Sequence, residues 1–165
     1  MMKKRFSTIL VIVIVLSLTL IYTIASTYAV IIDVKENDGV TEIVNVITLR
    51  DLVTDDNGNY NNVYYNVKNE LNITEDEAEL ILSSDKLNEN LQIVLNSIVD
   101  YKINNNTEAK LSNDEIYNLI LDGVNNTDTL SIELKDKIIN KANIYKQDIS
   151  DYVYDIEVNL IGGTA

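Results

Sequence analysis

An uncharged apolar segment near the N-terminus is the strongest pattern in the chain. No Asp, Glu, Lys or Arg occurs from Phe6 to Ile32, and residues 9–24 are mostly Ile, Leu and Val. At about 1.5 Å per residue, roughly 20 apolar residues cross the hydrocarbon core of a bilayer as a helix. The pattern therefore predicts a transmembrane helix over residues 6–32, in contact with the lipid bilayer.

The charges on either side of this segment predict its orientation. Lys3, Lys4 and Arg5 precede it, and acidic residues begin at Asp33. Because positively charged flanks stay in the cytoplasm, we expect residues 1–5 to form a cytoplasmic basic tip. The remainder of a single-pass membrane protein would then lie outside the cell membrane.

A cleaved signal peptide is the alternative for the same segment. Thr27 and Ala29 are small residues that suit a cut after position 29. Signal peptides usually have an apolar region of only about 7 to 15 residues, which is shorter than this one. The retained anchor is therefore the preferred interpretation.

After residue 60, apolar residues recur with the spacing of helix faces, and no proline interrupts them. Such stripes pack against other helices in a bundle. The three stripes are Val63, Tyr64, Val67 and Leu71; then Leu87, Leu91, Val94, Ile98 and Tyr101; then Leu130, Leu134, Ile138, Ala142, Tyr145, Ile149, Tyr152 and Ile156. We expect the third stripe to lie on one long helix. Tyr154 is expected outside the stripe, as a partly buried residue, with an exposed contact residue as the alternative.

Two helix starts carry the same capping signature. They are the segments 74–77 (TEDE) and 112–115 (SNDE), where a hydroxyl residue precedes a Glu by three positions. In this arrangement the hydroxyl accepts from the backbone N–H of the Glu, and the Glu side chain accepts from the backbone N–H of the hydroxyl residue. Ser84 is predicted to cap the helix that carries Leu87. The two capped units lie 38 positions apart, but no helical-repeat consensus is present.

The region before residue 60 is less regular. Residues 33–42 read as a linker, and the spacing of Ile43, Val46 and Ile47 favours a helix over residues 43–53. Two turn pairs leave a β alternative open. Asn57-Gly58 would close a β-hairpin between residues 43–53 and 63–67. Asp38-Gly39 would close another hairpin with the residues that precede it.

The C-terminus loses its charges abruptly. Residues 158–165 contain no charge, and Gly162 suits the end of a helix, which leaves 162–165 as a tail. The alternative expectation is a longer protein that continues beyond Ala165 into a returning transmembrane helix.

These patterns predict a mostly α fold. A single N-terminal transmembrane helix precedes a small extracytoplasmic helical bundle, which we expect to be one acidic helical domain over residues 43–161. About 130 residues are enough for an independent core.

The charge balance narrows the choice of partners. The chain has 26 acidic and 13 basic residues, and 10 of the basic ones follow the apolar segment, which gives that part a net charge of −16. Its lysines are scattered rather than clustered. Binding to a phosphate backbone depends on clustered Lys and Arg, so nucleic acid is not an expected partner.

The missing residue types narrow the possible chemistry. The chain has no Cys, His or Trp. This composition excludes disulfides, thiolate nucleophiles, Cys-ligated zinc and imidazole bases. An enzyme built from this chain would have to use Asp, Glu, Ser, Lys or Tyr.

The turn at residues 55–58 (DDNG) is the best metal candidate. Aligning Gly58 with the sixth position of a calcium-binding EF-hand loop puts Val53 first and Tyr64 twelfth, where carboxylates are needed. The pattern fails at both ends, so a solvated turn is the better interpretation. We predict no metal site and no cofactor.

Two further groups invite a catalytic interpretation. The acidic run Glu75, Asp76, Glu77 and Glu79 fits the first turns of a helix, where acids favour the positive end of the helix dipole. Ser83 and Ser84 would need Lys86 or Lys102 as a base, and neither lies in a recognisable motif. We therefore predict no catalytic residues.

The sequence is most compatible with a membrane-anchored extracytoplasmic protein that is not an enzyme. Its helical domain would engage another envelope protein or copies of itself. The layout resembles that of envelope proteins of low-GC Gram-positive bacteria, in arrangement rather than in a motif. Two alternatives stay open, namely a secreted binding protein released by signal-peptide cleavage and an enzyme without His or Cys.

Overall fold

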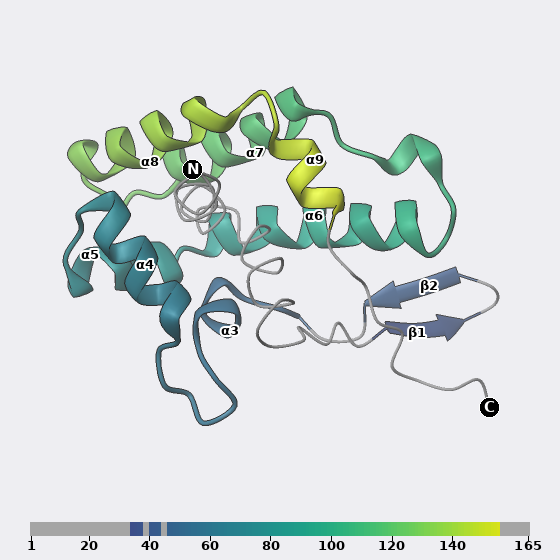
Figure 1. Cartoon of the computed structure of the whole chain (residues 1–165), viewed down its shortest axis with the longest axis horizontal. Coiled ribbons are helices and arrows are strands. Elements are labelled where there is room, and N and C mark those ends of the chain that lie inside the picture. Colours follow the sequence, from purple (N-terminus) through teal and green to yellow (C-terminus); the bar gives the residue numbers. More distant parts are fainter. Residues whose placement is uncertain (1–33, 38–39, 44–45, 156–165) are drawn as a thin grey trace, which may run out of the picture.

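The protein folds mainly as helices in its computed structural model, which describes residues 34–37, 40–43 and 46–155 (Figure 1). The mostly α prediction is therefore confirmed. The elements in chain order are β1 (Val34–Asn37), β2 (Val40–Ile43), α3 (Leu49–Val53), α4 (Asn62–Leu71), α5 (Glu75–Leu82), α6 (Asp85–Lys102), the short 3₁₀ helix η1 (Thr107–Ala109), α7 (Asn113–Asn125), α8 (Ile132–Tyr145) and α9 (Ile149–Tyr154).

Several predicted segments lie outside the described residues, namely the basic tip 1–5, the apolar segment 6–32, the end of the predicted helical domain from Ile156 to residue 161, and the tail 162–165. None of the helices in the described part is both long enough and apolar enough to span a bilayer.

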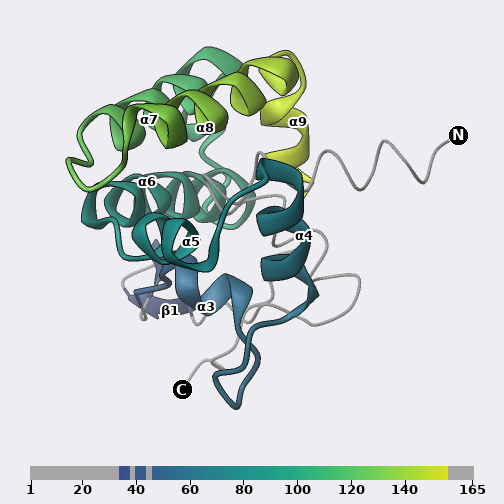
Figure 2. The same ribbon diagram turned by 90° about the vertical axis from the view of Figure 1, so that its left-hand side faces the viewer.

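Helix α6 is the centre of the fold. Figure 2 shows α7 and α8 on one side of it and α3 with the hairpin on the other. Five of its side chains are fully buried, and so are Ile120 of α7 and Ile138 of α8. The five are Leu87, Leu91, Val94, Leu95 and Ile98. The predicted stripes thus form the shared core, since burying apolar surface is the main stabilising term in folding.

The predicted helix starts are confirmed in atomic detail. Capping boxes form at Thr74 with Glu77 and at Ser112 with Glu115, each with reciprocal side-chain and backbone hydrogen bonds. The Ser84 hydroxyl accepts from the backbone N–H of Leu87 at 3.1 Å. The sequence predicts these helix starts because a capping box depends only on residues three positions apart.

A β-hairpin replaces the expected linker over residues 33–42. β1 and β2 pair antiparallel, with Val34 opposite Ile43 and Asn37 opposite Val40, which is the β alternative raised by the Asp38-Gly39 pair. Val34 is only 2% exposed. The amide of Asn104, at the end of α6, donates to the carbonyl of Thr41 and accepts from its N–H. The hairpin is therefore joined to the core.

The helix expected over residues 43–53 is shorter than predicted. Ile43 belongs to β2, and α3 begins only at Leu49. Thr48 and Asp51 form a capping box at that start. The common form of this signature has Glu or Gln at the third helical position, so Asp51 does not mark the start in the sequence.

The alternative hairpin around Asn57-Gly58 is wrong. The flanking segments are helices α3 and α4, joined by a turn in which Thr54 and Tyr60 form an isolated bridge. Gly58 adopts a φ of +78°, a left-handed conformation that glycine accommodates without strain. The Asn-Gly pair thus marks a turn between helices rather than between strands.

The long helix expected from Leu130 to Ile156 is interrupted. α8 ends at Tyr145 and α9 begins at Ile149. The amide of Asn113 bridges the break, because it donates to the carbonyl of Gln147 at 2.6 Å and accepts from the N–H of Ser150 at 2.7 Å. A side chain from α7 thereby supplies the backbone partners that a continuous helix would have provided.

The break also corrects the expected position of Tyr154. Its side chain is only 7% exposed, so it is part of the core rather than partly buried outside the stripe. The hydroxyl lies 2.7 Å from the Ser97 hydroxyl and accepts from the N–H of Leu111 at 2.8 Å. The change of chain direction after α8 is what brings Tyr154 inward.

Candidate binding surface

A polar cluster joins three elements, namely helix α3, the turn that precedes α4, and helix α5. The guanidinium of Arg50 donates to the Tyr60 hydroxyl at 2.8 Å and pairs with a carboxylate oxygen of Glu79 at 2.5 Å. The Tyr60 hydroxyl in turn donates to Glu79. Three separate elements are therefore held together by one network at the protein surface.

The cluster changes the proton affinities of its members. Hydrogen bonds from Arg50, and then from Tyr60, hold the pKa of the Glu79 carboxyl below its ordinary value. The hydrogen bond to Glu79 raises the pKa of Tyr60 and that of Arg50. Since all three shifts favour an ionised Glu79 between a neutral phenol and a cation, the network is intact near neutral pH.

Tyrosine rings extend this cluster into α4. The rings of Tyr60 and Tyr64 stack with their centroids 3.8 Å apart, and Tyr65 meets Tyr64 edge-on at 5.3 Å. Tyr64 is buried, whereas Tyr65 is 50% exposed. Stacked and edge-on aromatic pairs restrict one another's orientation. The exposed ring is therefore presented by a rigid support.

The side chain of Asp55 stabilises the turn before α4. One carboxylate oxygen of Asp55 accepts from the backbone N–H groups of Asn57 and Asn59, both at 2.9 Å. These bonds, first of all the one from Asn59, lower the pKa of Asp55. The carboxylate highlighted by the sequence thus has a structural role in the turn.

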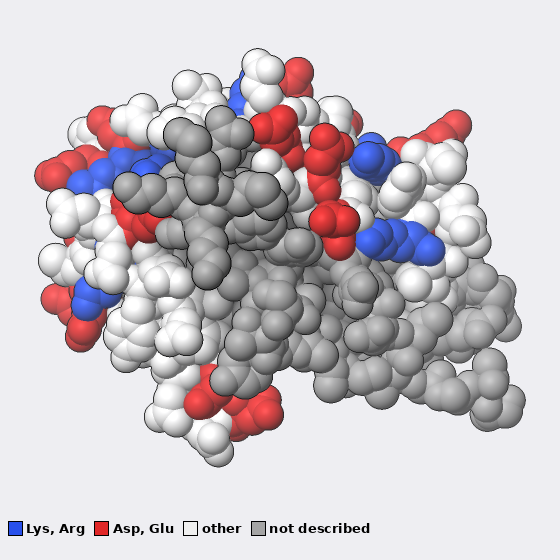
Figure 3. Space-filling model, in the orientation of Figure 1, with Lys and Arg blue, Asp and Glu red and all other residues white. Residues whose placement is uncertain are grey.

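The outward side of α4 carries no charge. Its exposed residues are Asn62, Tyr65, Asn66 and Asn69, and we call them the α4 outer face. Positions i, i+3, i+4 and i+7 share one side of a helix. The surface over α4, at lower left in Figure 3, is largely white, with red atoms at the turn below it.

The absence of charge extends beyond the helix face. Residues 57–67 contain no charged side chain, although 24% of the chain is Asp, Glu, Lys or Arg. Two charged residues border the α4 outer face, and each is paired with a neighbour. Lys68 lies 2.8 Å from Glu75, and Glu70 lies 3.6 Å from Lys141. The face is therefore a neutral patch on an acidic protein.

The asparagines of the α4 outer face differ from those used in the fold. Asn61 caps α4 by accepting from the N–H of Val63 at 2.9 Å. By contrast, the side-chain amides of Asn62, Asn66 and Asn69 form no hydrogen bond with other described residues. Each presents a donor and an acceptor to the solvent.

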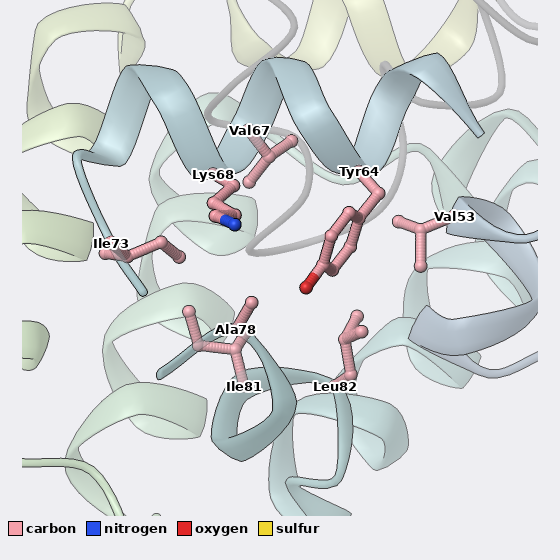
Figure 4. Close-up of a pocket in the computed structure, with 8 residues that line it drawn as sticks. All are labelled: Val53, Tyr64, Val67, Lys68, Ile73, Ala78, Ile81 and Leu82. Carbon is pink, nitrogen blue, oxygen red and sulfur yellow. The ribbon is translucent and has the colours of Figure 1, made fainter. Parts of the chain in front are cut away.

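The cavity beneath α4 is too small for an organic ligand. Figure 4 shows it between α4 and α5, with the Tyr64 hydroxyl directed into it. Its volume is about 10 Å³, close to that of one water-sized sphere. The other lining residues are Val53, Val67, Lys68, Ile73, Ala78, Ile81 and Leu82. It therefore acts as a packing gap under the surface.

A shallow groove lies between α4 and α8. Its volume is about 180 Å³, below the roughly 300 Å³ at which small-molecule sites begin. Its lysines are engaged within the protein, because Lys137 donates to the carbonyl of Asn72 at 3.1 Å and Lys141 pairs with Glu70. The exposed Ile144 forms one edge. The groove is a weaker candidate than the α4 outer face.

The structure separates the other residues highlighted by the sequence. Glu75 and Glu77 serve an ion pair and a cap, whereas Glu79 joins the Arg50 cluster. Ser84 lies 2.6 Å from the Thr127 hydroxyl in a buried contact, and the Lys86 ammonium lies 3.3 Å from Asp122. Ser84 and Lys86 are thus engaged with different partners.

Comparisons with known proteins do not assign this chain to a family. No family model, no curated protein and no solved structure matches it.

Proposed function

We propose that this protein is a membrane-anchored extracytoplasmic interaction module without an enzymatic role. Residues 6–32 hold it in the bilayer, and the helical domain contacts another component of the envelope or further copies of the chain. The observation that carries the proposal is the uncharged segment between the basic residues 3–5 and a strongly acidic remainder.

The distribution of exposed apolar side chains supports a modest contact. The large exposed ones in the described part are Val46, Tyr65, Ile93, Ile132 and Ile144. Ile132 and Ile144 lie near opposite ends of α8, and the other three lie in separate parts of the fold, so they do not form the broad apolar face that obligate assemblies bury. Recognition through mainly polar surface fits this exterior. Anchoring strengthens such contacts by raising the effective concentration of the partners.

The anchor is tested by fractionation and protease protection. The full-length chain with a C-terminal epitope tag should stay in the membrane fraction after alkaline carbonate washing, at its unprocessed mass. Externally added protease should remove the tag from intact cells while a cytoplasmic marker protein survives. Replacing Val13 and Leu16 by Lys should release the chain from the membrane, because charge in the apolar segment opposes insertion.

The alternatives give different results in the same assay. A shortened protein in the medium would support the cleaved, secreted form. If the full-length chain kept its tag when protease was added to intact cells, the proposed orientation would be contradicted. Recovery of the chain in the soluble cytoplasmic fraction would refute the anchor itself.

A further inference from the structure

The α4 outer face has hydrogen-bonding groups that match hydroxyls. A hydroxyl both donates and accepts, and so does a side-chain amide, whereas a carboxylate only accepts and an ammonium only donates. Three amides that form no hydrogen bond with other described residues flank one aromatic ring on this face, at Asn62, Asn66 and Asn69 around Tyr65. A surface of this kind can pair with several neighbouring hydroxyls without burying an unpaired charge.

The exposed ring supplies a flat apolar contact. Tyr65 is half exposed, and its inner side packs edge-on against the buried Tyr64. Tyr64 itself is stacked on Tyr60, whose hydroxyl is fixed by Arg50 and Glu79. Because the support is already ordered, little conformational entropy is lost when a flat ligand packs on the ring. The C–H face of a sugar ring is such a ligand.

Electrostatics favours a neutral ligand. The part of the chain after the apolar segment has a net charge of −16, and this field repels polyanions. The α4 outer face has no charged side chain of its own to overcome that repulsion. A protein partner would need an apolar centre in the contact, and this face offers one tyrosine among amides.

The length of the face favours a chain over a single sugar. Asn62 and Asn69 are seven residues apart, a rise of about 10 Å along the helix. A stripe of that length can meet successive units of a polymer. Weak individual contacts then add up when many anchored copies meet one repeating chain.

We propose that the α4 outer face binds a neutral, hydroxyl-rich polysaccharide outside the membrane. This inference rests on the proposed function, because an extracytoplasmic domain meets such polymers. Tyr65 provides the stacking surface, and the amides of Asn62, Asn66 and Asn69 bind the hydroxyls.

The test uses the purified full-length chain in nanodiscs of phosphatidylcholine, a lipid without net charge. The probes are an array of neutral oligosaccharides of glucose, galactose, mannose and N-acetylglucosamine, with polygalacturonate and heparin as anionic spots. We expect concentration-dependent binding to neutral spots and none above background to the anionic ones.

Two variants locate the binding on the surface. Tyr65→Ala should lower binding about ten-fold, the size of effect typical of an aromatic contact residue. Asn66→Asp keeps the side-chain shape but removes the donor and adds a charge, so it should weaken binding too. Asn118→Asp makes the same change at an exposed position of α7 and should leave binding unaltered.

The outcomes decide between this inference and the proposed function. Binding to no neutral spot, equal binding to anionic spots, or binding that survives both variants would overturn the polysaccharide site. Because the assay uses purified protein, it does not depend on where the chain resides in the cell. Loss of binding in both variants with unchanged melting temperatures would establish the site.

Discussion

An asparagine is buried in helix α6, whereas the asparagines of helix α4 are exposed. Asn90 of α6 is 1% exposed, and its amide donates to the Leu119 carbonyl at 2.7 Å and to Asp122 at 3.0 Å. Asn66 and Asn69 of α4 face the solvent. The NH2 group of Asn90 is thus engaged inside the protein, although its Oδ1 has no hydrogen-bond partner in the described part. An amide on the surface instead stays available for a ligand.

The two regions also differ in what a substitution should cost. Leu91 of α6, Ile120 of α7 and Ile138 of α8 are completely buried in one core, so a change there alters packing and solvation. A change on the α4 outer face replaces one solvated side chain by another. The difference separates residues that fold the domain from residues available for binding.

The largest expected effect is a charge in the core. Leu91→Asp or Ile138→Asp should lower the free energy of unfolding by about 4 kcal/mol, because each buries an unpaired carboxylate. Urea denaturation of the full-length protein in detergent measures this. Ile144→Asp is the control, since Ile144 is 65% exposed. If Leu91→Asp unfolded at the wild-type urea concentration, the assignment of α6 to the core would be wrong.

A smaller loss is expected when the buried tyrosine at the end of the fold is altered. Tyr154→Phe should cost about 2 kcal/mol, because it removes the hydroxyl that bridges Ser97 and the Leu111 N–H and leaves that N–H unpaired. Tyr65→Phe on the α4 outer face is the matched control. Equal melting temperatures for the two variants would erase the proposed difference between the regions.

The close approach of α6 and α7 gives a third prediction. A Cβ at Gly123 would lie 2.5 Å from Cδ2 of Leu87, whose side chain is fully buried. Gly123→Ala should therefore destabilise the protein by about 1 kcal/mol, since overpacking outweighs the better helix propensity of Ala. Asn118→Ala on the outer side of α7 should be neutral or stabilising. A rise in stability for Gly123→Ala would show that the two helices can separate without cost.

The smallest expected effect depends on pH. The pKa of Glu79 is lowered in the folded protein, so its contribution is present above the ordinary pKa of Glu and is lost as the pH falls through the lower folded value. Because the side chain is 43% exposed, the effect should stay below about 1 kcal/mol.

The measurement compares Glu79→Gln with the wild type at pH 7 and pH 3. The wild type should be the more stable at pH 7, and the gap should narrow below about pH 4. Glu108→Gln, an exposed position in η1, should show no such gap. A gap that widened on acidification would contradict the direction of the shift.

The candidate surface was only partly readable from the sequence. The apolar stripe of α4 implied that Tyr65 and Asn66 face outward, because they lie opposite Val67 and Leu71. The cluster that supports the ring was not readable, since Arg50, Tyr60 and Glu79 belong to three elements. Its members are up to 29 positions apart, and no local pattern links them.

The sequence by itself determined the helical class, the first two stripes and the helix starts at Thr74, Ser84 and Ser112. These features depend on residues within about four positions of each other, such as Thr74 with Glu77, so short-range chemistry is enough to fix them. It also determined the charge asymmetry around residues 6–32, which is a property of composition.

The tertiary structure alone decided where the chain changes direction. Asn104 pairs with Thr41 across 63 positions, and Asn113 bridges the break before Ser150 across 37 positions. Asparagine is common in this chain, and the sequence does not show which asparagines will bond to a distant backbone group. A long-range hydrogen bond forms only after packing has brought its partners together, because burial then penalises any amide left without one.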